Sequence, residues 1–312
     1  MIEIIGENMN NIDTVIHAQG LMFIYIGIGF LCRKLNITDD HVENKLTAAL
    51  MNIVFPCMIF TAMANILGST KLSDVLVAII ICIGLVLFSY GLGFLLYRKA
   101  PRKKRAVLIY SVLSSNAGFV GIPILAAIYG DTGVLYAAIY MAVIRVFTWT
   151  VGLKLYVHGE QHALRRIIVN PNNIAMVLAV VFQCLNIRLP NMMIEVMEEV
   201  GGISTLFCMV IVGSIVSSSF RFKRMLTPVA YWYSALRLLA IPLLTHFILT
   251  WLGIDATITG SMVILVAAPA PIMACVFAAR YNADKELAVL LVLVSTMLSL
   301  VTQPALIYLC NI

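Results

Sequence analysis

Two short stretches of this sequence place polar and helix-breaking residues inside long apolar runs. Residues 114–123 read Ser-Ser-Asn-Ala-Gly-Phe-Val-Gly-Ile-Pro, and residues 268–271 read Ala-Pro-Ala-Pro. Glycine weakens a helix, and proline removes a backbone N–H and clashes with the preceding turn. Each stretch therefore predicts a helix that stops and begins again, with backbone groups and polar side chains left to hold a small molecule.

The amide of Asn116 has the most versatile chemistry of these side chains, because it both donates and accepts hydrogen bonds. We expect the first helix to stop near Asn116 and to begin again near Pro123, with its positive dipole end beside a bound carboxylate. The predicted substrate-binding residues of the two stretches are Ser114, Ser115, Asn116, Gly118, Gly121, Pro123, Ala270 and Pro271. The alternative is that each stretch is only a proline kink, repaired by neighbouring Ser or Thr.

Arg145 adds a positive charge near the middle of the apolar run 133–155, whereas all Asp and Glu residues lie in loops or near the ends of such runs. An ionisable side chain at that depth is a functional hypothesis by default. A substrate carboxylate would supply the missing counter-ion of Arg145 through a bidentate pair. It is equally open that Arg145, like Arg237 in the run 228–252, caps carbonyls exposed at a helix break.

The elements that must position these residues are membrane-spanning helices. Of the 312 residues, 62% are hydrophobic and 12% are charged, against about 45–50% and about 25% in soluble domains. A helical span needs about 20 mainly apolar residues. The chain offers ten such runs, at roughly 14–32, 46–66, 74–97, 105–129, 133–155, 172–187, 193–218, 228–252, 256–280 and 286–309. We predict an all-α polytopic membrane protein with ten transmembrane helices.

The net charge of +6 reflects membrane topology. Nearly all of the 21 Lys and Arg residues lie in alternate loops, above all at 98–105. By the positive-inside rule these loops are cytoplasmic, which predicts a cytoplasmic (inner or plasma) membrane protein with both termini on the outer side. The cysteines show no metal-ligand spacing. We therefore expect no metal, no cofactor and no nucleic-acid partner.

Five spans in each half reverse the orientation of the second half, which is the arrangement of an inverted repeat. We expect the first repeat over 1–155, a cytoplasmic connector over 156–171 and the second repeat over 172–312. The two interrupted runs are fourth in their halves, so helices 4 and 9 should be broken and should cross. Broken helices in corresponding positions mark the binding site of many secondary transporters.

Two motifs carry a resemblance to a known family. Residues 116–123 read Asn-Ala-Gly-Phe-Val-Gly-Ile-Pro, and residues 170–175 read Asn-Pro-Asn-Asn-Ile-Ala. The first is similar to the Asn-x-Gly-Phe-x-Gly-x-Pro signature of the auxin efflux carrier family, and the second resembles the Asn-Pro-x-x-Ile-Ala motif of that family. The family belongs to the superfamily of bile acid, arsenite and riboflavin transporters. Prolines also stand where similar proteins place them, at Pro56, Pro269, Pro271 and Pro304. The resemblance covers essentially the whole chain.

The resemblance implies a transporter rather than an enzyme. Such a carrier exports a small organic anion, a mono- or dicarboxylate such as malate, malonate or an auxin-like acid, by an elevator-type alternating-access mechanism. Spans 1, 2, 6 and 7 would form a scaffold, spans 3–5 and 8–10 a transport domain, and the assembly would be a homodimer. The short connector differs from the large loop of the long plant auxin carriers, so auxin itself is not carried over as the substrate.

Other functions have less support from the residues. An intramembrane enzyme would need a catalytic motif, and the sequence has neither His-Glu-x-x-His nor Gly-x-Ser-x-Gly. Proton coupling would depend on His17 or His246, the histidines within apolar runs. A channel or a sensor is a further alternative. A sodium-coupled importer that resembles the bile acid symporters stays open, with a possible cation site at Ser295, Thr296, Ser299 and Gln303.

Overall fold

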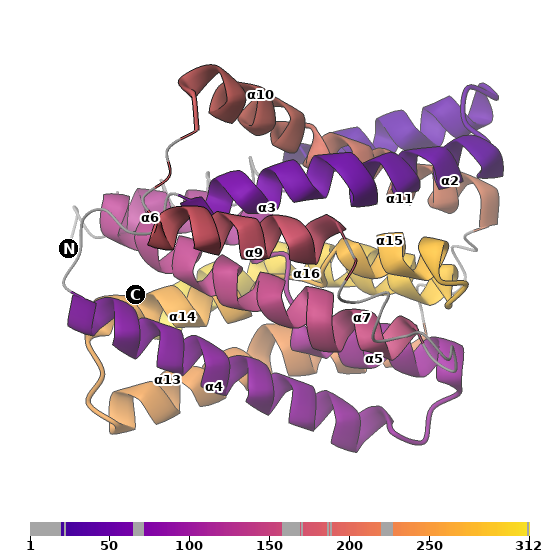
Figure 1. Ribbon diagram of the computed structural model, residues 1–312. Coiled ribbons are helices and arrows are strands. Elements are labelled where there is room, and N and C mark those ends of the chain that lie inside the picture. The colour runs from indigo at the N-terminus through magenta and orange to yellow at the C-terminus, as the bar shows by residue number, and fades with distance from the viewer. Residues whose placement is uncertain are drawn as a thin grey trace.

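In the computed structural model, all regular secondary structure of the described residues is helical, with no strand among them (Figure 1). These residues are 20–21, 23–64, 72–157, 169, 171–185, 187, 189–219, 227–310 and 312. Within them, 6 helical runs are long and apolar enough to cross a membrane: Asp40–Thr61, Val75–Tyr97, Thr132–Tyr156, Asn191–Ser218, Pro228–Trp251 and Lys285–Leu309. The prediction of an all-helical chain with several membrane spans is confirmed. His17, Asn170 and most of the predicted connector lie outside the described residues.

In the first half of the chain, residues 23–34 are helical and further helical elements follow. These are α2 (Asp40–Ala49), the π-helical turn η1 (Leu50–Val54), α3 (Phe55–Ala64), α4 (Leu72–Tyr97), α5 (Arg102–Leu113), η2 (Ala117–Gly121), α6 (Ile122–Phe147), η3 (Thr148–Gly152) and α7 (Leu153–Tyr156). Helix α2 begins at the N-cap Asp39, whose carboxylate accepts from the N–H of Val42 at 2.7 Å. This hydrogen bond lowers the pKa of the Asp39 carboxyl.

The second half consists of α9 (Pro171–Cys184), α10 (Asn191–Gly202), α11 (Ser204–Ser219), α12 (Pro228–Ala235), η5 (Leu236–Ala240), α13 (Ile241–Trp251), α14 (Ala256–Val266), α15 (Met273–Arg280) and α16 (Lys285–Leu309). Helix α3 packs against α9 and α10, α4 packs against α5 and α6, and α14 packs against α6 and α13. The two halves of the chain are therefore interleaved, as Figure 1 shows for α3 beside α9.

The helix over 23–34 packs directly on the backbone of α11. A Cβ atom added at Gly29 would overlap the backbone of Val210, and one added at Gly213 would overlap the carbonyl oxygen of Ile26. Two helices can approach this closely only where small residues face each other. The partner of the glycine-rich segment around Gly29 thus lies within the same chain.

The first interruption is shorter than the sequence predicts. Helix α5 ends at Leu113, residues 114–116 are not helical, and the chain is helical again from Ala117 rather than from Pro123. Pro123 stands in the first turn of α6, directly after the π-helical turn η2. The prediction placed the end of the interruption too late because it treated the two glycines of the motif as helix breakers.

Both of these glycines allow close packing within a helical segment. A Cβ atom at Gly118 would lie 2.9 Å from Cε of Met141, and one at Gly121 would lie 2.9 Å from Cδ2 of Leu265. Gly130 has φ of 57° and ψ of −140°, a backbone conformation that glycine adopts readily because it has no Cβ atom. The chain changes direction there, within α6, and then enters the span Thr132–Tyr156.

The second interruption separates α14 from α15. Helix α14 ends at Val266, and α15 begins at Met273 after the N-cap Ile272. The prediction of a restart at Pro271 thus differs from the structure by one turn or less. The ring of Phe277 on α15 contacts those of Tyr110 and Trp149, with centroid distances of 5.2 and 5.4 Å. This aromatic contact fixes α15 against α5 and η3.

Candidate functional site

The two interrupted segments are in direct contact. The backbone N–H of Asn116 donates to the carbonyl oxygen of Pro269 at 2.8 Å, which joins the first interruption to the second. The hydroxyl of Ser115 donates to the carbonyl oxygen of Leu265 at 2.9 Å, in the last turn of α14. Carbonyl groups at a helix end have no partner within the helix. The first interruption therefore donates hydrogen bonds to carbonyl oxygens at and after the end of α14, in the second interruption.

The last turn of α5 is capped by two side chains that lie one turn apart. The hydroxyl of Tyr233 donates to the carbonyl oxygen of Ser111 at 2.8 Å, and Nη1 of Arg237 donates to that of Val112 at 3.0 Å. Both side chains are completely buried. Arg237 thus caps a carbonyl group at a helix end, which is one of the two roles that the sequence left open for the arginines within apolar runs.

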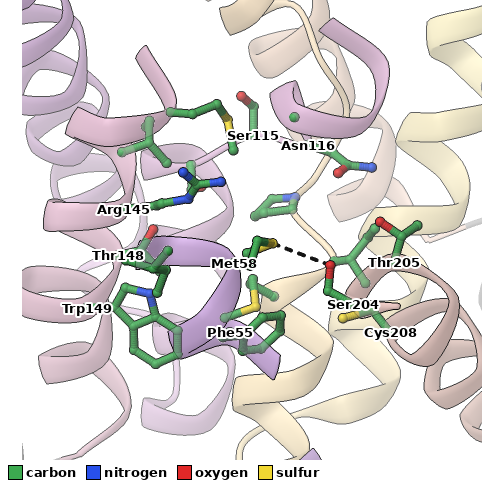
Figure 2. Close-up of a pocket in the computed structure, with 18 of the residues that line it drawn as sticks. Phe55, Met58, Ser115, Asn116, Arg145, Thr148, Trp149, Ser204, Thr205 and Cys208 are labelled. Carbon is green, nitrogen blue, oxygen red and sulfur yellow. Dashed lines mark hydrogen bonds between the residues drawn. The ribbon is translucent and has the colours of Figure 1, made fainter. Parts of the chain in front are cut away.

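A cavity of about 240 Å³ lies where the two interruptions meet the helices around them. Figure 2 shows Arg145 and Thr148 on one side of this cavity, with Asn116 and Thr205 on the other. Its lining residues are Phe55, Met58, Ile59, Tyr110, Ser114, Ser115, Asn116, Gly118, Ile122, Met141, Ile144, Arg145, Thr148, Trp149, Ser204, Thr205, Cys208, Pro271, Ile272 and Met273. Arg145 is the charged member of this described set, and none of the set is acidic.

The guanidinium of Arg145 differs from that of Arg237 in its contacts. Within the described residues, Arg145 forms no hydrogen bond or ion pair, and its buried Nε has no acceptor. Figure 2 shows the guanidinium directed into the cavity. Arg145 is of intermediate exposure, and a partly buried cation gains from a nearby anion because few water molecules surround it. The arrangement is suited to an anionic ligand that enters the cavity and contacts Arg145.

Two helix N-termini also border the cavity. Asn116 is the N-cap of the segment that continues through η2 into α6, and Ile272 is the N-cap of α15. The first N–H groups of a helix have no acceptor within the helix, and they carry the positive end of its dipole. Both ends therefore favour a negative charge on the ligand.

The Asn-Pro motif at the start of α9 positions the helices beside the cavity. The side-chain amide of Asn172 donates to the carbonyl oxygen of Met51 in η1 at 2.8 Å. The amide of Asn173 donates to that of Trp149 in η3 at 3.2 Å. Carbonyl groups of π-helical turns are thus tied to α9, and the lining residue Trp149 is held in place.

The predicted site residues divide into those that line the cavity and those that do not. Ser114, Ser115, Asn116, Gly118, Arg145 and Pro271 line it. Gly121 packs against Leu265, and Pro123 stands in the first turn of α6. The N–H of Ala270 donates to Oγ of Ser295 at 2.9 Å, so this backbone group joins the second interruption to α16.

The residues of the possible cation site lie on α16, away from the cavity lining. Ser295 contacts Ala270 as described, and the hydroxyl of Ser299 donates to the carbonyl oxygen of Thr296 at 2.8 Å. Gln303 lines a separate small cavity. The hydroxyl of Thr296 is buried and has no partner among the described residues.

The sequence interpretation missed the wall of the cavity formed by α3, η3 and α11. Thr148 and Trp149 follow Arg145 at the spacing of one helical turn, so they share its face of the helix. This signal was present in the sequence. Ser204 and Cys208 have no local signal, because their approach depends on how α11 packs in the folded chain.

Known proteins similar to this chain are membrane transporters. A family model described as membrane transport protein matches residues 15–163 and 157–307. The chain belongs to this family, which is the auxin efflux carrier family indicated by the sequence motifs. An uncharacterized transporter from Methanothermobacter thermautotrophicus is 25% identical over 306 residues, which cover 95% of this chain and 97% of that protein. The chain is therefore a multi-pass membrane transporter.

Proposed function

We propose that this transporter carries a small organic anion and that the cavity at Arg145 is its substrate site. The observation that carries the proposal is the guanidinium of Arg145, which faces the cavity without a counter-ion among the described residues. A carboxylate would accept two parallel hydrogen bonds from it, a pairing stronger than that of neutral groups. The N-termini at Asn116 and Ile272 add to the attraction.

The size and lining of the cavity support a small mono- or dicarboxylate. A volume of about 240 Å³ corresponds to roughly eight water molecules at about 30 Å³ each. A dicarboxylate of three or four carbons, such as malonate or malate, would fit within this volume. A single lining cation pairs with one carboxylate, and Asn116, Thr148 and Ser204 offer hydrogen bonds to the remaining polar groups. The rings of Phe55 and Trp149 would accommodate the apolar part of an auxin-like acid.

We also propose an arrangement of the membrane spans. Ten spans would form a 5+5 inverted repeat over 1–155 and 172–312. The broken helix 4 would comprise α5, η2 and α6 up to Gly130, and the broken helix 9 would comprise α14 and α15. The contact of Asn116 with Pro269 supports a crossing of these helices. Irregular backbone at membrane depth is tolerated where protein covers it or a cavity adjoins it, and the cavity meets this condition.

The mechanism that we propose is an elevator. The scaffold would comprise the helix over 23–34, α2 to α3 and α9 to α11, and the transport domain would comprise α4 to α7 and α12 to α16. The cavity is lined by residues of α3 and α11, which belong to the proposed scaffold, and by residues of α6 and α15, which belong to the proposed transport domain. A substrate bound to the transport domain would then move past the scaffold wall. The family resemblance also supports a homodimer.

The basic loop at 98–105 supports a cytoplasmic-membrane location with this loop in the cytoplasm and both termini outside. Export of an anion could then be driven by the membrane potential, at about 2.3 kcal/mol per charge for 100 mV. This direction needs no coupling ion. Coupling to sodium is the alternative, and the buried hydroxyl of Thr296 is the observation that favours it.

Transport assays in liposomes test these proposals together. Purified protein would be reconstituted, and charge movement and counterflow recorded with malate, malonate, other small carboxylates and indole-3-acetate, with and without sodium. A saturable, sodium-independent signal that is lost in Asn116→Ala is expected. A signal seen only with sodium would replace export with the symporter mechanism. Anion flux without saturation or counterflow would identify a channel and contradict the proposal.

A further inference from the structure

The hydroxyl of Ser115 is engaged by two other groups of the protein, although Ser115 lines the cavity at Arg145. It donates to the carbonyl oxygen of Leu265 at 2.9 Å. Its oxygen also lies 3.4 Å from the hydroxyl oxygen of Tyr140. A serine hydroxyl has a single proton, and the proton of Ser115 is used for Leu265. Tyr140 is therefore the donor in the second contact.

These hydrogen bonds make Ser115 a poor direct partner for an anion. A carboxylate accepts hydrogen bonds and cannot donate them. Ser115 has no proton left to offer, and the remaining lone pair of its oxygen would repel a carboxylate oxygen. Figure 2 shows this hydroxyl directed away from the guanidinium of Arg145. The sequence places Ser115 among the substrate-binding residues, whereas its contacts indicate a supporting role.

Tyr140 on α6 is held so that it donates toward Ser115. It is 2% exposed and lies outside the described lining of the cavity. The positive charge of Arg237 acts on the hydroxyl of Tyr140, and Arg237 is itself fixed by its hydrogen bond to the carbonyl oxygen of Val112. A cation attracts the oxygen of a nearby hydroxyl and repels its proton. The proton of Tyr140 is thus directed to Ser115.

The hydrogen bond from Ser115 helps to fix the segment 114–116, which is not helical. In the next residue, the N–H of Asn116 donates to the carbonyl oxygen of Pro269. Two consecutive residues of the first interruption are thus tied to carbonyl oxygens at and after the end of α14. The direction of the Asn116 side chain follows from the backbone of this segment. The hydroxyl of Ser115 therefore contributes to the way in which the amide of Asn116 borders the cavity.

We propose that Ser115 and Tyr140 are positioning residues of the substrate site, which hold the amide of Asn116 in place and do not contact the substrate themselves. This role rests on the proposed function, because it acts on the same anion through Asn116. Tyr140, Ser115 and Leu265 all belong to the proposed transport domain, so their hydrogen bonds need not break when that domain moves. Loss of these hydrogen bonds should therefore weaken the affinity for the anion and leave the maximal rate unchanged.

Counterflow into liposomes that contain the full-length protein tests this role, with malonate, malate and indole-3-acetate as probes. Apparent affinity and maximal rate, normalised to the amount of folded protein, would be measured for Ser115→Ala, Tyr140→Phe and the double variant. Tyr308→Phe, which removes the same hydroxyl group from an exposed side chain of α16, is the matched control. Melting temperatures in detergent would be recorded beside them, because a purely structural role lowers stability without changing affinity.

We expect the apparent affinity to fall about tenfold in Ser115→Ala and about threefold in Tyr140→Phe, at native maximal rates. The double variant should bind no more weakly than Ser115→Ala alone, because Tyr140 acts through Ser115. Tyr308→Phe should match the native protein in both values.

Native affinity in Tyr140→Phe together with a loss in Ser115→Ala would make Ser115 a direct ligand. That result would overturn the positioning role while the proposed function stands, as would additive losses in the double variant or native affinity in both single variants. The absence of counterflow with every probe in the native protein would contradict the proposed function and this role with it. Tyr140→Phe keeps the test valid if Ser115→Ala does not fold.

Discussion

The backbone N–H of Asn116 lies 2.8 Å from the carbonyl oxygen of Pro269, and this hydrogen bond joins the two interrupted segments of the chain. Residues far apart in the sequence are thereby brought to one border of the cavity that Arg145 faces. The contact is made by backbone atoms, so it does not depend on the side chain of Asn116. That side chain lines the cavity, and the proposed function gives its amide a role in binding.

The capping of α5 predicts a specific loss of stability in Tyr233→Phe. This change removes the hydroxyl that donates to the carbonyl oxygen of Ser111 and leaves a buried acceptor without a partner. The expected cost is about 1–3 kcal/mol. Thermal unfolding in detergent would measure it. Tyr231→Phe, on an exposed side chain of the same helix, is the control and should unfold as the native protein does.

The contact between the helix over 23–34 and α11 predicts that Gly213→Ala destabilises the protein. The new Cβ would overlap the carbonyl oxygen of Ile26, so the two backbones must separate. Such overpacking costs about 1–3 kcal/mol. Gly27→Ala is the matched control, because its Cβ meets no atom within 4 Å and alanine favours the helix. Equal melting temperatures for the two variants would contradict this packing.

The ion pair between Glu43 and Lys285 predicts a coupled pair of substitutions. Nζ of Lys285 on α16 lies 3.0 Å from Oε1 of Glu43 on α2, and the Glu43 side chain is 2% exposed. Lys285→Met would leave a buried carboxylate without its partner, at a cost of about 1.5–3 kcal/mol. Adding Glu43→Gln should restore most of that stability. A double variant less stable than Lys285→Met would show that the pair contributes no such coupling.

The same pair bears on the proposed elevator, because α2 belongs to the proposed scaffold and α16 to the proposed transport domain. If the two units slide, this contact must break during each cycle. The double variant Glu43→Gln with Lys285→Met should then transport at least as fast as the native protein while it remains folded. Transport rates in liposomes, normalised to the amount of folded protein, would measure this. A loss of transport with full stability would contradict the assignment of α2 and α16 to separate moving units.

The sequence predicts much of the fold because membrane helices are marked by long apolar runs. The prolines at 269 and 271 also indicate the end of α14 and the start of α15 within about one turn. The first interruption was predicted less well. Gly118 and Gly121 are helical in the structure, since they serve close packing against Met141 and Leu265. A glycine that packs and a glycine that breaks a helix have the same appearance in a single sequence.

The sequence predicted only part of the cavity lining. Asn116 and Arg145 both line the cavity, as do four of the remaining predicted residues. The part of the lining contributed by Phe55 on α3 and Ser204 on α11 depends on contacts between distant helices. The difference between the two intramembrane arginines is likewise tertiary, because Arg237 finds the carbonyl oxygen of Val112 only in the folded chain.

The most direct test of the account is counterflow of malonate and malate into liposomes that contain Arg145→Gln, with Arg145→Lys and Lys154→Gln beside it. Lys154 lies in the same span but is exposed and outside the cavity lining, so its loss controls for charge. We predict that Arg145→Gln folds normally and weakens the apparent affinity at least about tenfold. Arg145→Lys should retain part of it and Lys154→Gln all of it. Native affinity in folded Arg145→Gln would contradict the proposed role of Arg145 in binding the anion.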